Sequence, residues 1–160
     1  MRLAQLLLRG GRITGILLLV LVSVVGVAAC GTGGTAVMPA SPIASIHFAM
    51  TDQNGSGVSG TGSVVKADGS FTVTIKLTKM LVGSSHVSHI HAGRCAQPGG
   101  IAFALQQVIA DASGSATTAS TLPVTYLVPS SGWYVNVHEG PDFTEPEYAP
   151  SISCGDLPAA

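Results

Sequence analysis

The sequence predicts an all-β domain, an antiparallel β-sandwich or flattened barrel of about eight strands. No stretch after residue 30 has sustained helical periodicity, and Gly, Thr, Ser and Val dominate there. Residues 71–78 alternate apolar and polar side chains without a miss, which is typical of a half-buried strand. Short apolar segments with turn residues between them recur along the rest of the chain, a spacing typical of sandwiches and barrels.

The strands can be placed in order. Residues 46–50 form the first, and the Asp-Gln-Asn-Gly-Ser-Gly run at 52–57 is dense in turn residues. Residues 58–66 form the second, and Ala-Asp-Gly-Ser at 67–70 makes a tight hairpin turn into the strand at 71–78. Further strands are expected at 87–91, 101–108, 115–120 and 133–138 and around Ile152.

The N-terminus has the order of a bacterial secretory signal. Three arginines precede an apolar run at 16–25, which is shorter than the roughly 20 residues of a membrane span. Val-Ala-Ala-Cys at 27–30 resembles the lipobox of bacterial lipoproteins. We therefore expect residues 1–29 to be a signal peptide, with lipidated Cys30 anchoring the protein to the outer face of the cytoplasmic membrane, in the cell envelope. An uncleaved membrane anchor is the alternative.

The composition of the mature chain limits its number of domains and the kinds of partner it can bind. Residues 30–42 are mostly Gly, Thr, Ala, Ser and Pro without periodicity, as in a flexible tether, and 43–160 is expected to be one folded domain. Three of the seven Lys and Arg residues leave with the signal while all eight Asp and Glu residues stay, so the mature net charge is 4 minus 8, or −4. Nucleic acid is therefore an unfavourable partner.

Two remaining cysteines follow the chain's histidine segments. Cys95 and Cys154 form an even pair in an oxidising compartment, and we expect them to be bonded. The chain-entropy model gives such a loop of about 60 residues roughly 4 kcal/mol of stabilisation.

Histidine spacing indicates a metal site. His89 and His91 are two residues apart on a predicted strand and so point to one face, and His138 on another strand would supply a third imidazole. Three imidazoles suit copper. His86 is a fourth candidate, but it has the opposite parity and joins them only if the strand bends or begins after it; surface exposure is the expectation. Asn136 has the parity of His138 and is expected to orient it.

The sequence around these histidines resembles that of the copper/zinc superoxide dismutases. His-Ile-His at 89–91 with Cys95, Val-His-Glu-Gly-Pro-Asp at 137–142 and Ile-Ser-Cys-Gly at 152–155 occur in that family's order. The resemblance implies a Greek-key β-barrel, one copper ion on His89, His91 and His138, a disulfide between Cys95 and Cys154, and superoxide as substrate.

A second resemblance covers the same residues. His-Ile-His, Gly-Gly-Ile-Ala-Phe-Ala-Leu at 99–105 and Trp-Tyr-Val-Asn-Val-His at 133–138 are similar to the chordin-type (CHRD) domain, which has no established enzymatic role. That resemblance implies a related all-β module for adhesion or envelope interactions, with the histidines in structural roles.

Departures from the dismutase pattern limit the expected activity. Residues 96–137 contain no histidine, so the family's zinc site cannot be built. Ser151 stands where the family has an arginine that draws in superoxide, and the acidic residues that follow His138 would repel an anion. Three functions stay open: a zinc-less copper dismutase, extracytoplasmic copper storage or delivery, and a non-catalytic module.

Overall fold

The computed structural model describes residues 44–159. The predicted signal peptide, lipidated Cys30 and tether lie outside the described residues. No helix in this part of the chain is long and apolar enough to span a membrane. The described elements are the strands β1 (Ser45–Asp52), β2 (Ser59–Ala67), β3 (Ser70–Thr78), β4 (Ser85–His86), β5 (Ser88–Arg94), β6 (Gln97–Ala104), β7 (Val108–Ile109), β8 (Ala116–Leu122), β9 (Trp133–His138) and β10 (Ser151–Asp156) and the 3-10 helix η1 (Pro146–Tyr148).

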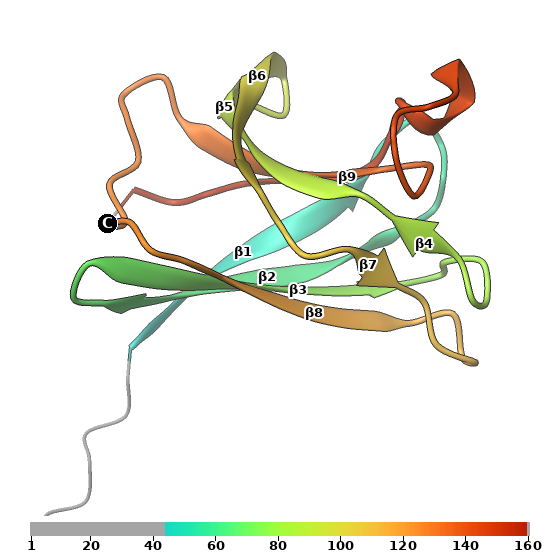
Figure 1. Cartoon of the computed structure of the whole chain (residues 1–160), viewed down its shortest axis with the longest axis horizontal. Helices are drawn as coiled ribbons and strands as arrows, with labels where there is room; N and C mark the ends of the chain where they lie inside the picture. Colours follow the sequence, from blue (N-terminus) through green and yellow to red (C-terminus); the bar gives the residue numbers. More distant parts are fainter. Residues whose placement is uncertain (1–43, 160) are drawn as a thin grey trace, which may run out of the picture. The chain divides into compact units, whose positions relative to one another are not determined.

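Eight strands form one curled antiparallel sheet in the order β6-β5-β9-β10-β1-β2-β3-β8, and β4 pairs with β7 beside it. The curl produces two layers, with β1, β2, β3 and β8 in one and β5, β6, β9 and β10 in the other (Figure 1). The chain crosses between the layers so that β8 returns beside β3 and β9 beside β5. These crossed connections agree with the predicted Greek-key fold class.

Alternating side chains close the core between the layers. Phe71, Val73, Ile75 and Leu77 of β3 are all at most 2 % exposed, while the threonines and Lys76 between them are not buried. This alternation confirms the strand predicted at 71–78. Burying each such side chain stabilises the fold by roughly 1.5–3 kcal/mol.

Aromatic packing connects the edge strand β6 to β3, the neighbour of the opposite edge strand β8. Phe71 on β3 meets Phe103 on the edge strand β6 with ring centroids 6.4 Å apart, and Trp133 and Tyr126 complete the cluster. Edge-to-face and offset ring pairs of this kind add about 0.5–1.5 kcal/mol beyond burial. The sheet is thus a flattened barrel that closes through side chains.

Two local features differ from the expected strands. The strand predicted at 101–108 begins earlier, at Gln97, and ends at Ala104, while Val108 belongs to the separate strand β7. Register irregularities beside His91 let β6 start within a Gln-Pro-Gly-Gly segment whose composition is typical of a turn. β4 was not predicted, since two residues are too few for a recognisable alternation.

Candidate metal centre

Three histidines converge on the outer face of the layer that contains β5 and β9. Ile90 and Val137 are 0 % exposed and point into the core, so the residues on either side of each point outward. His89, His91 and His138 are nevertheless only 7 %, 8 % and 6 % exposed. The pairing of β5 with β9 brings the two histidine segments side by side, with His89 opposite the residue two before His138.

The ring nitrogens of these histidines are close enough to share one ion. One nitrogen from each of His89, His91 and His138 lies within 4.8 Å of the others. Nitrogens about 2.0–2.1 Å from a common metal would lie about 3–4 Å apart, so modest ring rotations complete the approach. Nδ1 of His89 and Nε2 of His91 are buried without any hydrogen-bond partner. Since buried polar atoms are normally paired, these two unpaired nitrogens are suited to bind a metal ion.

Backbone carbonyls fix which nitrogen each ring offers. His91 Nδ1 donates to the carbonyl of Gly99 at 2.9 Å, and His138 Nδ1 donates to the carbonyl of Ala149 at 2.7 Å. A carbonyl oxygen only accepts, so both Nδ1 atoms carry the proton and both Nε2 atoms keep a lone pair. Partners of this kind on the far nitrogen are typical of metal-binding histidines. The donor set is therefore His89 Nδ1, His91 Nε2 and His138 Nε2.

Burial favours the neutral form of His89 and of His138. It lowers the pKa of His89 from 6.5 to about 4, and the positive charges that His138 and His91 would carry add to the effect. The pKa of His138 is also lowered, chiefly by burial, although its bond to Ala149 opposes the shift. Metal ions bind unprotonated imidazole, so protons on His89 and His138 do not compete with a metal at neutral pH.

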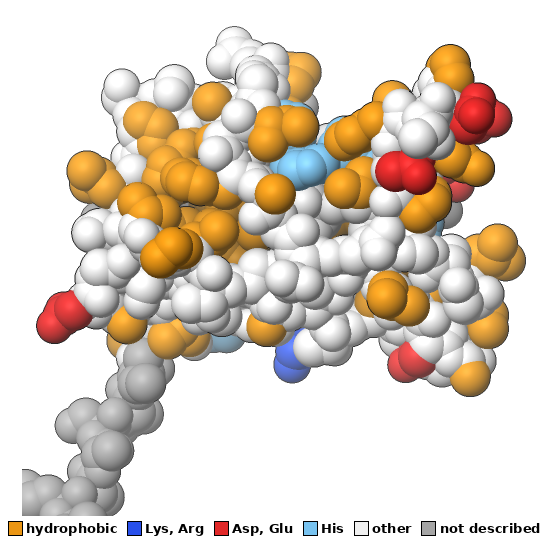
Figure 2. Space-filling model, in the orientation of Figure 1, with side chains coloured by type: hydrophobic (Ala, Val, Ile, Leu, Met, Phe, Trp, Pro, Cys, Tyr) orange, Lys and Arg blue, Asp and Glu red, His pale blue; other side chains and the backbone are white. Residues whose placement is uncertain are grey.

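Aromatic rings cover the histidines. Phe143 stacks on His89 with ring centroids 5.5 Å apart at 16°, and meets His138 edge-on at 4.8 Å and 82°. Tyr134 stacks on His91 at 5.1 Å. Figure 2 shows histidine side chains in a hollow of the surface between hydrophobic side chains, with acidic side chains to one side. The site is thus shallow, apolar at its rim and nearly closed.

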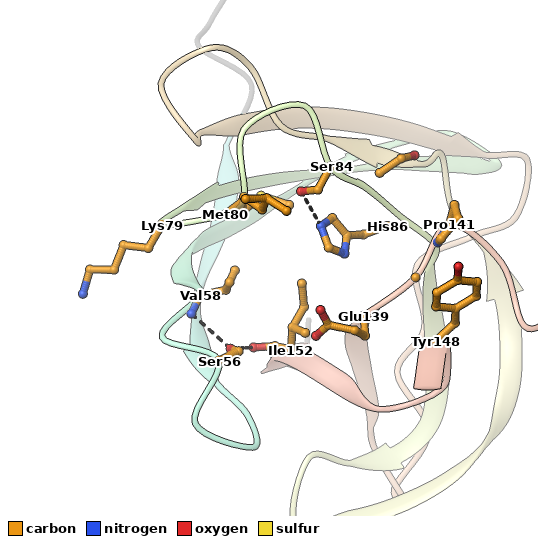
Figure 3. A pocket seen from close by; sticks show the side chains of 13 residues that line it. Ser56, Val58, Lys79, Met80, Ser84, His86, Glu139, Pro141, Tyr148 and Ile152 are labelled. Carbon is orange, nitrogen blue, oxygen red and sulfur yellow. Dashed lines mark hydrogen bonds between the residues drawn. The ribbon is translucent and has the colours of Figure 1, made fainter. Parts of the chain in front are cut away.

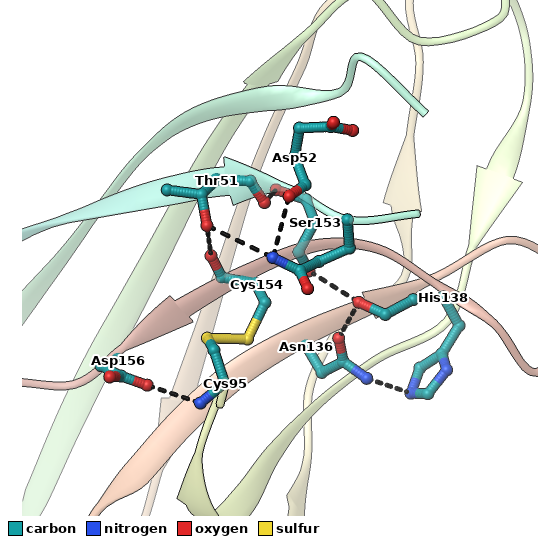
Figure 4. The surroundings of a disulfide bond; sticks show 10 residues. Thr51, Asp52, Cys95, Asn136, His138, Ser153, Cys154 and Asp156 are labelled. Atoms are coloured by element: carbon teal, nitrogen blue, oxygen red, sulfur yellow. Dashed lines mark hydrogen bonds between the residues drawn. A yellow bond between two sulfur atoms is a disulfide. The ribbon is translucent and has the colours of Figure 1, made fainter. Parts of the chain in front are cut away.

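Asn136 bonds to the histidine nitrogen that faces the site. Its Nδ2 donates to His138 Nε2 at 3.1 Å, and its Oδ1 accepts from the hydroxyl of Ser151 (Figure 4). The sequence predicted that Asn136 orients His138, but the amide occupies the lone pair that a metal would use, and Ala149 does the orienting. Ser151, at the position of the missing arginine, holds Asn136.

Cys95 and Cys154 form a disulfide pair, as expected, with Cα atoms 6.0 Å apart (Figure 4). The bond ties the hairpin between β5 and β6 to β10, where Cys154 lies opposite Asn136 of β9. Cys95 N also donates to Asp156 Oδ1 at 2.8 Å. The hairpin that carries the Gly99 carbonyl is thereby fastened to the rest of the sheet.

His86 lies apart from the three histidines. It is 5 % exposed, so the expected surface position is wrong. Its Nδ1 donates to the backbone carbonyl of His138 at 2.9 Å, and its Nε2 pairs with the hydroxyl of Ser84 at 2.7 Å. His86 instead lines a separate cavity of about 460 Å³, together with Glu139 and Tyr148 (Figure 3). With both nitrogens bonded elsewhere, His86 is not placed to act as a fourth ligand.

The segment that follows β9 carries four exposed acidic side chains. Glu139, Asp142, Glu145 and Glu147 are exposed on residues 139–147. Hydrogen bonds from the backbone N–H and the hydroxyl of Thr144 lower the pKa of Asp142, so its carboxylate is charged at neutral pH. The nearest loop therefore attracts cations and repels anions.

Several contributors could not be seen in the sequence. The carbonyls of Gly99 and Ala149 carry no residue-type signal, because every residue has one. Phe143 is five residues from His138 and lies over it only because the loop folds back. The histidines themselves carried the signal, since their two-residue spacing is readable on a strand.

Comparisons with known proteins bear on the fold. No family model and no curated protein matches the chain. Among solved structures, a superoxide dismutase (SOD)-like protein from Bacillus subtilis matches with a TM-score of 0.57 and 20% identity, covering 70% of this chain and 97% of that chain. A double mutant of a SOD-like protein from the same organism matches with a TM-score of 0.57 and 21% identity, covering 69% and 95%. A further mutant gives 0.54 and 17%, covering 69% and 96%. These likenesses show a SOD-like β-fold.

Proposed function

We propose that this protein binds one copper ion through His89 Nδ1, His91 Nε2 and His138 Nε2, outside the cytoplasm. The observation that carries the proposal is the pair of buried, unpartnered nitrogens on His89 and His91 beside the third imidazole. Packing alone gives no reason to bury two such atoms. A bound cation would satisfy both.

The donor chemistry favours copper. Imidazole nitrogens suit copper and zinc, and the affinity of a given site rises through the divalent series to Cu²⁺ and falls at Zn²⁺. The SOD-like fold supports the same choice, while no further group of three or more histidine, cysteine or carboxylate ligands occurs among residues 44–159. We propose no zinc site of the dismutase kind.

The place of action follows from the N-terminal sequence. Lipidated Cys30 would hold the domain on the outer face of the cytoplasmic membrane, and residues 31–42 would tether it there. The disulfide supports an oxidising compartment. The membrane is thus the proposed partner of the N-terminus.

The negative charge of the loop after β9 favours one of the two activities that a copper site could have. Bound copper that cycles between its two oxidation states could disproportionate superoxide, but the acidic loop repels that anion and Ser151 offers no positive charge. The same loop attracts copper ions. We therefore propose copper storage or delivery as the main role, with superoxide disproportionation as the second candidate, which the fold supports.

Copper titration tests the binding claim. Wild-type protein should take up one equivalent, and a His89→Ala, His138→Ala double variant should lose at least about 100-fold in affinity, because metal-ligand sites need their full donor count. His47→Ala is the matched control, since His47 is exposed on β1 and bonded to Ser45. Equal binding by wild type and double variant would remove the metal site and leave the chordin-type, non-catalytic module.

The activity claim needs its own assay. Copper-loaded wild type is expected to accelerate superoxide decay no more than the same protein after copper removal. A clear acceleration that disappears in the double variant would favour the dismutase instead. When zinc is added in an amount equal to the bound copper, it should not displace the copper from the protein.

A further inference from the structure

Phe143 is a large apolar side chain with no place in the core. It is 47 % exposed and is not part of the buried cluster between the layers or of the residues packed against it. Its aromatic contacts are with two of the three site histidines. Single exposed apolar side chains are common on protein surfaces, so the informative feature is the position of this ring against His89 and His138.

The loop holds this ring in place. Glu139 N donates to the carbonyl of Pro150 at 2.8 Å, and Gly140 N donates to that of Tyr148 at 3.2 Å, so the two arms of the loop are joined. A Cβ on Gly140 would lie 2.1 Å from the Tyr148 ring, which shows how closely the arms approach. Next to Phe143, the Asp142 carboxylate accepts from the N–H and hydroxyl of Thr144. The ring thus sits on a braced segment.

We propose that Phe143 controls access to the metal centre, excluding water and anionic molecules from the ion that His89, His91 and His138 would hold. This inference rests on the proposed copper site. The ring stacks on His89 and meets His138 edge-on, and the acidic side chains of the same loop add repulsion toward anions. Phe143 therefore selects which ligands reach the ion, and it slows removal of copper by anionic chelators.

Metal-free protein gives a first test that needs no copper. Diethyl pyrocarbonate modifies accessible neutral imidazoles, and modification of His89 can be followed by peptide mass spectrometry. Phe143→Ala should raise the rate at His89 by about tenfold, the factor expected for loss of one well-packed aromatic contact. Leu127→Ala is the control, because Leu127 is an apolar residue that is 74 % exposed and has no aromatic ring to stack on the histidines. An unchanged rate at His89 would overturn the proposal.

Copper-loaded protein gives the second test. Phe143→Ala should bind azide more tightly and release copper to an anionic chelator about tenfold faster, whereas Phe143→Tyr should behave as wild type because it keeps the ring. Phe143→Leu serves if the alanine variant does not fold, and it should fall between the two. Equal azide affinity and release in wild type and these variants would contradict the role. Wild type that binds no copper would instead refute the copper site, leaving the modification result to stand by itself.

Discussion

At the scale of single residues, the neutral state of His89 links acidity to stability. Burial holds its pKa at about 4 in the folded protein against 6.5 for the free side chain. As pH falls between these values, the unfolded chain takes up a proton that the folded chain does not. The free energy of unfolding of the metal-free protein should therefore decrease as pH falls from 6.5 toward about 4.

Urea unfolding across that pH range measures the effect. His89→Gln, which cannot take up this proton, should show a weaker pH dependence than wild type. Parallel curves for the two proteins would show that His89 titrates normally in the folded state.

Asn136 gives a second prediction at this scale. Its amide holds the lone pair of His138 Nε2, so copper must displace it. Asn136→Ala should bind copper more tightly than wild type, yet lower the free energy of unfolding by about 1–3 kcal/mol, because buried partners lose their bonds. Parallel copper titration and denaturant unfolding report both values. Weaker copper binding by the variant would show that the amide supports the bound state.

Residue patterns predicted the ligands but not their surroundings. His89 and His91 share a face by strand alternation, which spacing reveals, and His138 was found through the resemblance to the dismutases and its place on a second strand. Opposite parity correctly separated His86 from the other histidines, but its expected exposure was wrong, because the His138 carbonyl that buries and binds it comes from a distant part of the chain. The ring cover and the carbonyl partners depend on loop paths that local sequence does not encode.

At the scale of elements, the β5–β6 hairpin sets the orientation of His91. Gly99 approaches β5 so closely that a Cβ there would lie 2.4 Å from the carbonyl oxygen of Ala92, and this approach brings the Gly99 carbonyl to His91 Nδ1. Gly99→Ala should lower the free energy of unfolding by about 1–3 kcal/mol, as overpacking does, and weaken copper binding.

The adjacent glycine supplies the control. A Cβ added at Gly100 would have no neighbouring atom within 4 Å, so Gly100→Ala should leave copper binding unchanged. Thermal unfolding and copper titration of both variants make the comparison. Equal behaviour of the two variants would mean that the hairpin does not position His91.

Strand predictions succeeded where the strand contributes many buried residues. Residues 133–138 match β9 in full, where all residues after Trp133 are buried, and β3 differs from its prediction by one residue because its alternation is strict. β6 was misplaced because its residues are mostly exposed and include Pro and two glycines, so no apolar face marks them. Pairing to β5, a nonlocal interaction, creates that strand.

At the scale of the whole molecule, the disulfide fastens the site-bearing hairpin to β10 across 59 residues. Replacing Cys95 and Cys154 by alanine should lower the free energy of unfolding by about 2–5 kcal/mol. One copper should still bind, because the β5–β9 ladder holds the histidines together. Dithiothreitol should destabilise wild type to a similar extent and leave the stability of the variant without Cys95 and Cys154 unchanged. Equal stability of wild type and variant would show that the bond contributes nothing.

Three imidazole nitrogens of this fold are proposed to surround one copper ion. X-ray absorption spectroscopy of the protein loaded with one equivalent of copper measures the neighbours of that ion. We expect three nitrogen neighbours near 2.0–2.1 Å with the outer-shell pattern of imidazole rings. A spectrum dominated by oxygen neighbours, unchanged when His89, His91 and His138 are all replaced by alanine, would contradict this expectation.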